Sequence, residues 1–403
     1  MTAAVAEKPK YFPLRQRTGT ASHHLSTDAV GFGLDDLDKL TPKEVVFLLA
    51  EARWGSTKTM ACPHCGTIEK HYWRAREHRW KCKACDKTFS VTSGTVLADH
   101  KLPLVKLLKI IFSWANGSSG KAALQLRRDW NVSYPTVFTL LHKMREGLMR
   151  GFNVGVLCGV QEMDGMDVNG RRYKEKRNKP QGGGGAGAPK LPEHLLKPTG
   201  EAVGPPAPPK AGKAARQHPD RRIMLVTRQR GVAKGKGAAF TRIAMAITES
   251  GKTVRATAQR FISAESAVMS DEDPSYAAFG KLFAQHETIK HSETFSKPGG
   301  IHNNHAESFN WRARRAAEGI YLNPSNKYLQ DYMVEQAWRE DMRRLSTFNR
   351  LKALLTSVLN VGLSQWFRGY THGHHREYEF LVEGQRPAKG RGKQKGWREK
   401  PPR

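Results

Sequence analysis

The chain has 403 residues, of which 38% are hydrophobic and 26% are charged, a composition that suits a soluble protein of two or three domains. Its formal net charge is +30, from 67 Lys and Arg against 37 Asp and Glu, and such an excess repels itself unless a polyanion such as nucleic acid binds it. No apolar run approaches the roughly 18 residues of a membrane span and no signal sequence follows Met1, so we expect a cytoplasmic protein with no membrane partner.

The first segment with a regular pattern begins near residue 41. Residues 1–38 are polar without a sustained period, and we predict that they form a flexible arm. Thr41-Pro-Lys-Glu44 is typical of a helix start with proline in the first turn, and the valines and leucines that follow supply an apolar face. This helix leads into the segment that holds most of the cysteines.

Four of the five cysteines form two C-x-x-C pairs that are 16 residues apart, Cys62 with Cys65 and Cys82 with Cys85. A gap of two residues lets both sulfurs of a pair face one metal ion, and two pairs complete a tetrahedral site. His64, inside the first pair, is an alternative ligand. A site that four sulfurs close has no open position for a reaction, so we predict structural Zn²⁺. The helix and this zinc ribbon are predicted to occupy residues 39–100.

Residues 101–152 have the pattern of helices. A helix from Ala122 to Trp130, a short turn and a helix from Pro135 to Met149 match the helix-turn-helix, although any short helical hairpin looks similar. In that motif the second helix enters the major groove of DNA. Polar residues that lie off its apolar stripe are predicted to be exposed and to contact double-stranded DNA: Thr136, His142, Lys143 and Arg145.

Two segments are basic and poor in apolar residues. Residues 171–222 are rich in Gly and Pro and carry 13 Lys or Arg against 4 Asp or Glu. Such a segment buries too little apolar surface to offset its chain entropy, so we predict a disordered basic insertion between two strands. Residues 356–385 are predicted to be a C-terminal helical region. Residues 386–403, with 8 basic residues and 1 acidic residue, are predicted to be a tail that contacts phosphates.

Acidic residues stand at the ends of predicted strands in the second half of the chain. A strand that starts at Val160 presents Asp164, a later strand delivers Asp271, and a helix that opens near residue 301 carries Glu307. The elements between the first and last of these follow in the order strand, strand, helix, strand: 223–226, 243–247, 253–261 and 267–270. Carboxylates suit Mg²⁺, and two such ions about 3.5–4 Å apart can activate an attacking oxygen and stabilise a leaving oxygen.

These motifs, in this order, resemble one family: bacterial insertion-sequence transposases of the DDE type with an N-terminal zinc ribbon, the ISXO-like transposases. The resemblance covers residues 40–355 except for the insertion. Its motifs in this chain are Trp80-Lys-Cys82-Lys-x-Cys85, Glu162-x-Asp164, Ser270-Asp271-Glu272 and Ile301-His302-x-Asn304-x-x-Glu307. After the first aspartate the family usually has an acidic residue and Thr, whereas this chain has Gly165 and Met166.

The resemblance implies a multidomain α+β protein whose catalytic domain, residues 153–355, has an RNase H-like mixed sheet. It implies that Asp164, Asp271 and Glu307 bind catalytic Mg²⁺ or Mn²⁺, with Asn304 as the alternative third ligand. Arg314 stands where a lysine is common and is expected to contact a DNA phosphate.

The expected function is therefore a DNA transposase that binds terminal inverted repeats and carries out metal-dependent strand cleavage and transfer. We expect it to form a homo-oligomer on DNA, because two ends are joined at once, and to act at the bacterial nucleoid. A catalytically inactive DNA-binding regulator derived from a transposase is the alternative. A nuclease of the same fold that cuts without joining is a third possibility.

Overall fold

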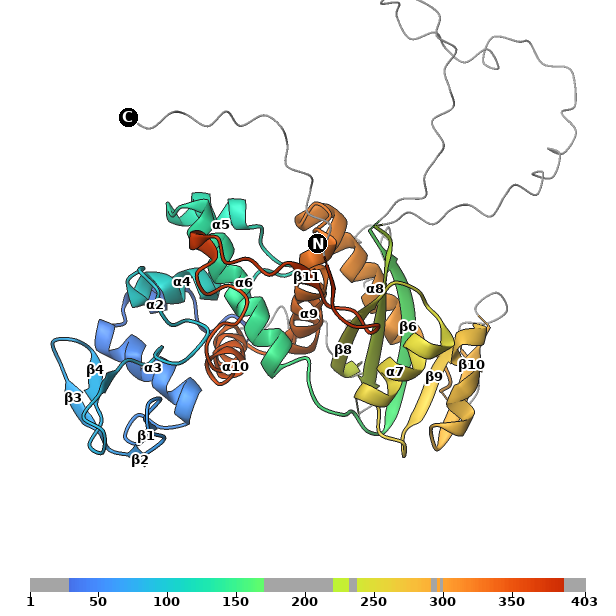
Figure 1. The fold of residues 1–403 in the computed structure, drawn as a ribbon, viewed down its shortest axis with the longest axis horizontal. Coiled ribbons are helices and arrows are strands. Elements are labelled where there is room, and N and C mark those ends of the chain that lie inside the picture. Colours follow the sequence, from blue (N-terminus) through green and yellow to red (C-terminus); the bar gives the residue numbers. More distant parts are fainter. Residues whose placement is uncertain (1–28, 170–219, 232–237, 291–295, 298–299, 388–403) are drawn as a thin grey trace, which may run out of the picture. The chain divides into compact units, whose positions relative to one another are not determined.

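The computed structural model describes residues 29–169, 220–231, 238–290, 296–297 and 300–387 (Figure 1). The predicted insertion up to residue 219, the first 28 residues of the predicted arm and the tail from residue 388 lie outside these ranges. The end of the predicted arm is ordered, in contrast to the prediction. Its helix α2 (Leu34–Asp38) packs against α4, and the Leu37 side chain is fully buried.

Helix α3 (Pro42–Trp54) begins and ends where the sequence indicates. The Thr41 hydroxyl accepts a hydrogen bond from the Glu44 amide, and the Glu44 carboxylate accepts one from the Thr41 amide. This reciprocal pair satisfies amides that have no partner inside the first turn of the helix. Gly55 ends the helix with φ of 67°, a backbone conformation that favours glycine.

The cysteine-rich segment folds into a ribbon of short strands with an aromatic core. In it β1 (Met60–Ala61) pairs with β2 (Ile68–Glu69), and a second sheet holds β3 (Tyr72–Arg74), β4 (Arg79–Lys81) and β5 (Thr88–Phe89). The Trp80 side chain is 2% exposed, and its ring lies 5.6 Å from that of Trp54 on α3. Helix α3 and the ribbon therefore share one apolar core.

Three helices follow, as predicted: α4 (Leu104–Ala115), α5 (Ala123–Trp130) and α6 (Tyr134–Gly151). Ser133 caps α6 through its hydroxyl, which accepts from the Thr136 amide. Helix α6 contacts α5 and also two later helices, α9 (Asn326–Met342) and α10 (Thr347–Leu359). It is therefore surrounded by other helices along most of its length.

The predicted strands form one mixed sheet of five strands, in the order β10-β9-β6-β7-β8. The strands are β6 (Val160–Val168), β7 (Arg222–Arg230), β8 (Ala238–Ala246), β9 (Ala267–Asp271) and β10 (Gln285–Ile289). Strands β6, β7 and β8 pair in antiparallel fashion, whereas β6, β9 and β10 are parallel. The order of three strands, helix, strand and later helix is the one predicted for an RNase H-like domain. Strand β10 was not predicted.

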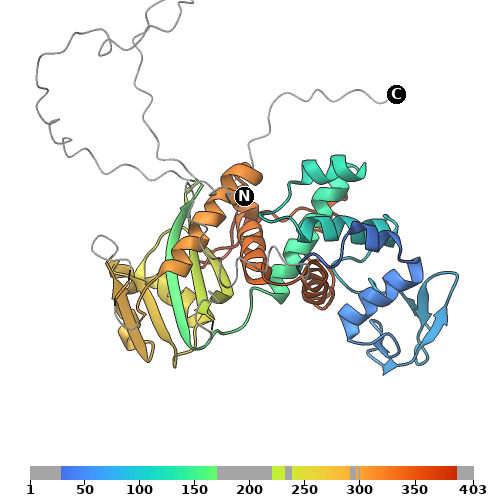
Figure 2. The same ribbon diagram turned by 180° about the vertical axis from the view of Figure 1, so that it is seen from behind.

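Both faces of the sheet are covered by helices. On one face α8 (Asn304–Arg315) contacts β6 and β7, and α9 contacts β8 (Figure 2). Met166 and Phe309 of α8 belong to one apolar cluster. On the other face α7 (Gly251–Phe261) contacts β7 and β8, and the 3₁₀ helix η3 (Pro274–Lys281) contacts β9 and β10. Met163 and Val254 of α7 belong to a second apolar cluster. Because side chains alternate along a strand, Asp164 lies on the α8 face.

The prediction of a helical region over residues 356–385 was wrong for most of its length. Helix α10 ends at Leu359, and only the 3₁₀ turn η5 (Tyr370–His372) and the short strands β11 (Tyr378–Glu379) and β12 (Arg386–Pro387) follow. Buried ion pairs tie this segment down instead: Glu379 pairs with Arg222 at 2.6 Å, and Arg376 with Asp331 at 2.7 Å. These partners are distant in sequence, so no local pattern indicates them.

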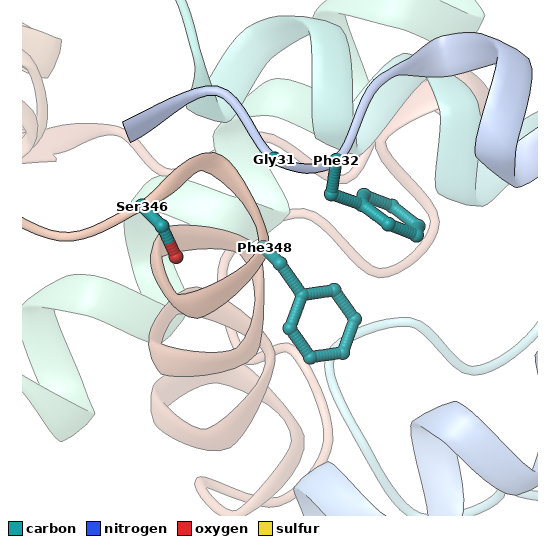
Figure 3. A pocket seen from close by; sticks show the side chains of 4 residues that line it. All are labelled: Gly31, Phe32, Ser346 and Phe348. Carbon is teal, nitrogen blue, oxygen red and sulfur yellow. The ribbon is translucent and has the colours of Figure 1, made fainter. Parts of the chain in front are cut away.

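A cavity of about 410 Å³ lies between the segment before α2 and the start of α10, lined by Gly31, Phe32, Ser346 and Phe348 (Figure 3). The rings of Phe32 and Phe348 are 5.0 Å apart, and the described residues that line the cavity include no ionisable side chain. Among the described residues, none of the helices has the length and hydropathy that spanning a membrane requires.

Candidate functional site

The four predicted zinc ligands meet at one point. The Sγ atoms of Cys62 and Cys85 are 3.8 Å apart, those of Cys65 and Cys82 are 3.6 Å apart, and all four lie within 4.8 Å of one another. A tetrahedron with zinc–sulfur bonds of about 2.3 Å has edges of about 3.8 Å. The observed spacing therefore fits Zn²⁺. His64, the alternative ligand, is not part of the group, and its Nε2 lies 3.4 Å from the Thr88 carbonyl oxygen.

The register of the sheet brings the first two predicted catalytic residues to the same level. Strands β6 and β9 run parallel and pair from Val160 with Ala267 to Glu162 with Met269. Two residues further along each strand stand Asp164 and Asp271, on the same face. The described pairing of β6 with β9 ends at Glu162 and Met269, just before this level.

Helix α8 carries Glu307, the third predicted ligand, and also Asn310, which contacts Asp164. The Asn310 side chain donates a hydrogen bond from Nδ2 to Asp164 Oδ2 at 2.7 Å. Glu307 lies three residues earlier and so shares the face of α8 that turns to Asp164. Asn310 is 6% exposed, and its Oδ1 has no hydrogen-bond partner in the described part of the chain. The sequence analysis gave Asn310 no role, although its spacing of three residues from Glu307 places both on one face of a helix.

The electrostatic environment of Asp164 is unusual for a carboxylate. Burial, together with the negative charges of Glu249 and Glu307, raises its pKa to about 7, against hydrogen bonds from the Gly165 amide and Asn310. Neither Asp164 nor Asp271 makes an ion pair with a basic side chain in the described ranges. Carboxylates gathered without a counter-charge are typical of a site that binds cations.

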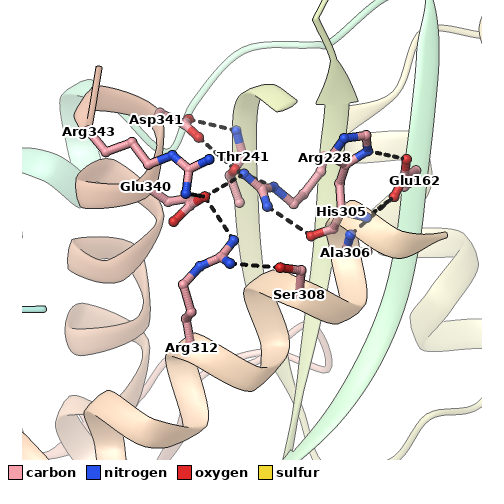
Figure 4. Close-up of polar contacts among 10 residues, drawn as sticks. All are labelled: Glu162, Arg228, Thr241, His305, Ala306, Ser308, Arg312, Glu340, Asp341 and Arg343. Atoms are coloured by element: carbon pink, nitrogen blue, oxygen red, sulfur yellow. Dashed lines mark hydrogen bonds and ion pairs between the residues drawn. The ribbon is translucent and has the colours of Figure 1, made fainter. Parts of the chain in front are cut away.

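The first turn of α8 is fixed to the sheet by a separate set of contacts (Figure 4). The buried Glu162 carboxylate accepts hydrogen bonds from the backbone amides of His305 and Ala306, at 2.7 and 3.1 Å, and from the His305 ring. Arg228 on β7 donates to the His305 carbonyl oxygen at 2.8 Å. Glu162 therefore positions α8, and with it Glu307, relative to Asp164 two residues along the same strand.

Glu162, His302 and His305, like the four cysteines, place ligand atoms within 4.8 Å of one another, whereas Asp164, Asp271 and Glu307 do not form such a group. Arg230, however, donates to Glu162 Oε1 at 2.6 Å, and its positive charge would repel a metal ion. Burial alone would raise the pKa of Glu162, but the contacts with His305 and Arg230 outweigh it and hold that pKa below its usual range. This group fits a structural contact better than a metal site.

Asn304, the alternative third ligand, is the first residue of α8 and is exposed. Its neighbour Asn303 is fully buried and donates to the Met163 carbonyl oxygen at 3.4 Å. The contact of Asn310 with Asp164 turns the face of α8 that holds Glu307 toward Asp164.

The prediction that the polar residues of α6 are exposed was wrong for two of them. Arg145 is 2% exposed and pairs with Glu335 on α9 at 2.7 Å, and it lies over the ring of Tyr332. His142 is fully buried among aromatic rings, and burial lowers its pKa well below the usual value. Lys143 is half-buried and donates to the Ala98 carbonyl oxygen. Neither Arg145 nor His142 is placed to contact DNA.

The basic surface that remains accessible lies elsewhere. Thr136, at the first turn of α6, is half-buried, and α5 exposes Arg127 and Arg128 beside it. On α8, Arg314 is exposed and lies seven residues after Glu307, on the same face of the helix. Trp311, 59% exposed, is covered on one side by the Arg315 guanidinium.

Two family models match the chain. The ISXO2-like transposase domain matches residues 200–341, and the transposase zinc-ribbon domain matches residues 44–88. No curated protein matches the chain. The first match contains Asp271 and Glu307 and begins after Asp164; the second contains all four cysteines of the zinc site.

Proposed function

We propose that the chain is a transposase of the kind that combines a zinc ribbon with an ISXO2-like transposase domain, and that it binds the ends of a mobile DNA element and cleaves and joins DNA strands there. The observation that carries the proposal is that Asp164 and Asp271 stand at the same level of adjacent strands, on the face of the sheet that α8 covers with Glu307.

The acidic site fits hard divalent cations. Its donors are carboxylate oxygens and the unpartnered Oδ1 of the buried Asn310, the ligand type that Mg²⁺ and Mn²⁺ prefer. When bound, two such ions would stabilise negative charge on the attacking and leaving oxygens of a phosphodiester.

The protein's own residues would hold and orient the reacting groups. The Gly165 amide and Asn310 each donate to one oxygen of Asp164 and so fix the orientation of its carboxylate. Glu162 fixes the start of α8, which keeps Glu307 in place. Arg314, exposed on the same face of α8, would bind a phosphate of the DNA strand near the reacting one.

Recognition of the DNA ends would involve the ribbon, α5 and the start of α6 rather than the length of α6. Arg127 and Arg128 are exposed there, whereas Arg145 is not. We expect a homo-oligomer on DNA, because two ends are joined in one event, and we expect it to act at the nucleoid.

The test is a reaction of the purified full chain with a duplex that carries the element's end, in Mg²⁺ or Mn²⁺, followed on denaturing gels. We expect nicked and joined products with the native chain and none with Asp271→Ala, while DNA binding is kept. Glu272→Ala is the matched control, since Glu272 is the next residue and is exposed. Binding without cleavage in either metal would overturn the proposal in favour of a regulator, and cleaved products without joined ones would identify a nuclease.

A further inference from the structure

Glu249 lies at the acidic site although no sequence motif includes it. It stands between β8 and α7, and its carboxylate lies against the backbone of Gly165 on the face of the sheet opposite α8. A Cβ atom at position 165 would come within 2.1 Å of Glu249 Oε1 and 2.4 Å of Oε2. The carboxylate of Glu249 thus occupies the space that any side chain at position 165 would need.

The position of this carboxylate is held by a buried partner. The Tyr276 hydroxyl donates a hydrogen bond to Glu249 Oε1 at 2.7 Å. Tyr276 is 1% exposed, and its ring packs at 5.4 Å from that of Phe279. Glu249 is therefore oriented before any ligand binds.

Glu249 is also close to the two aspartates of the site. Burial raises the pKa of Glu249 most, and the charges of Asp273, Asp167 and Asp271 raise it further, while the charge of Glu249 in turn raises the pKa of Asp164. The carboxylate of Glu249 lies against Gly165, the residue next to Asp164. No basic side chain forms an ion pair with Glu249 in the described segments.

A second observation indicates that a ligand binds here. Asn310 is buried with its Nδ2 bonded to Asp164 and its Oδ1 left without a partner among the described residues. A buried acceptor without a partner lowers stability unless a water or a cation satisfies it. Its location beside Asp164, which makes no ion pair with a basic side chain in the described ranges, suits a cation and the water that the cation carries.

We propose that Glu249 is a fourth carboxylate of the divalent-cation site that Asp164, Asp271 and Glu307 form, and that residue 165 is glycine because this carboxylate fills the space beside it. The inference rests on the proposed function. Glu249, in the segment before α7, would approach the cation from the face of the sheet opposite Glu307. The cation would then be held from both faces of the sheet.

The experiment measures Mn²⁺ binding to the zinc-loaded full chain without DNA, from the electron paramagnetic resonance signal of free Mn²⁺. Glu249→Gln keeps the size of the side chain and an acceptor for Tyr276, and we expect it to weaken binding by roughly 10- to 100-fold. Gly165→Ala leaves every carboxylate in the chain but displaces that of Glu249, and we expect a similar loss. Glu272→Gln, an exposed carboxylate next to Asp271, is the control and should bind as the native chain does.

Asp164→Asn distinguishes a failure of the role proposed for Glu249 from a failure of the proposed cation site. If it weakens Mn²⁺ binding while Glu249→Gln does not, the role of Glu249 is wrong and the proposed site stands. If Asp164→Asn leaves binding unchanged, the proposed site itself is wrong, whatever Glu249→Gln does. Zinc content and circular dichroism identify a variant that fails to fold, and Glu249→Gln, the mildest change, then decides the outcome.

Discussion

Two buried groups of charged residues in this protein differ in how their charges are balanced. Around α6 and α9, Glu335 accepts hydrogen bonds from Arg145, Arg339 and Tyr321, and opposite charges alternate. At the sheet, Asp164 lies beside Glu249 without a basic partner in the described chain. The balanced group holds helices together, whereas the unbalanced group lowers stability and would gain stability from the divalent cation that we propose. The balance of charge, more than burial, is what separates these two groups.

Breaking the balanced group should have the largest effect on stability. Arg145→Ala leaves Glu335 fully buried with fewer partners, which we expect to lower the free energy of unfolding by about 3–5 kcal/mol. Chemical denaturation of the full chain measures the change. Arg128→Ala, on the exposed face of α5, is the control and should stay within about 0.5 kcal/mol. Unchanged stability with loss of DNA binding would instead support the sequence-based role of Arg145.

Removing a charge from the unbalanced group should stabilise the cation-free protein. The pKa of Asp164 is about 7 in the folded chain, against 3.8 for an unperturbed aspartate, so the folded state binds more protons between these values and loses stability as pH rises through them. Asp164→Asn cannot ionise, and a rotated Asn310 amide could offer it the free Oδ1. We therefore expect the variant to be more stable than the native chain by a few kcal/mol at pH 8 and by much less at pH 5.

Thermal unfolding of the zinc-loaded chain at the two pH values measures this difference. Mg²⁺ should raise the melting temperature of the native chain and leave that of Asp164→Asn nearly unchanged. An equal difference between the two proteins at pH 5 and pH 8 would show that Asp164 is not protonated in the folded state.

The smallest effect is expected at the exposed edge of the acidic site. Arg314→Ala should weaken DNA binding equally for all sequences and reduce the slope of log K against log salt by about 0.9, the value for one phosphate contact. Arg255→Ala, exposed on α7 at the other face of the sheet, is the control. Titrations at several salt concentrations measure the slope. An unchanged slope for Arg314→Ala would remove this residue from the DNA interface.

The parts that the sequence predicted correctly are those set by local spacing. The two cysteine pairs contain their own turns, and the apolar runs of β7 and β8 are continuous, so both are visible in a short window. Strand β10, Gln285–Ile289, was missed because it is mostly polar and lies at the edge of the sheet. Local pattern was the only guide in both cases. It was clear for the four cysteines and absent for β10.

The errors and omissions at the site depend on contacts between distant residues. Arg145 was predicted to be exposed because its partner Glu335 lies 190 residues away. Glu249 was missed because its position beside Gly165 depends on how α7 packs on the sheet. The contact of Asn310 with Asp164 was missed because α8 and β6 are far apart in the sequence. Contacts between distant residues, rather than residue type, decide each of these positions.

The hairpin of β6 and β7 explains how the chain accommodates a long connection beside its acidic residues. The two strands pair from Gln161 with Gln229 up to Val168 with Arg222, the last residues before the connection. Closing so long a loop instead of a short turn costs only about 2 kcal/mol of entropy, because the cost grows with the logarithm of length. One residue added within β6 would turn Asp164 to the opposite face, whereas many residues added after Val168 leave it in place. The sequence between β6 and β7 can therefore lengthen without changing the register that sets the face of Asp164.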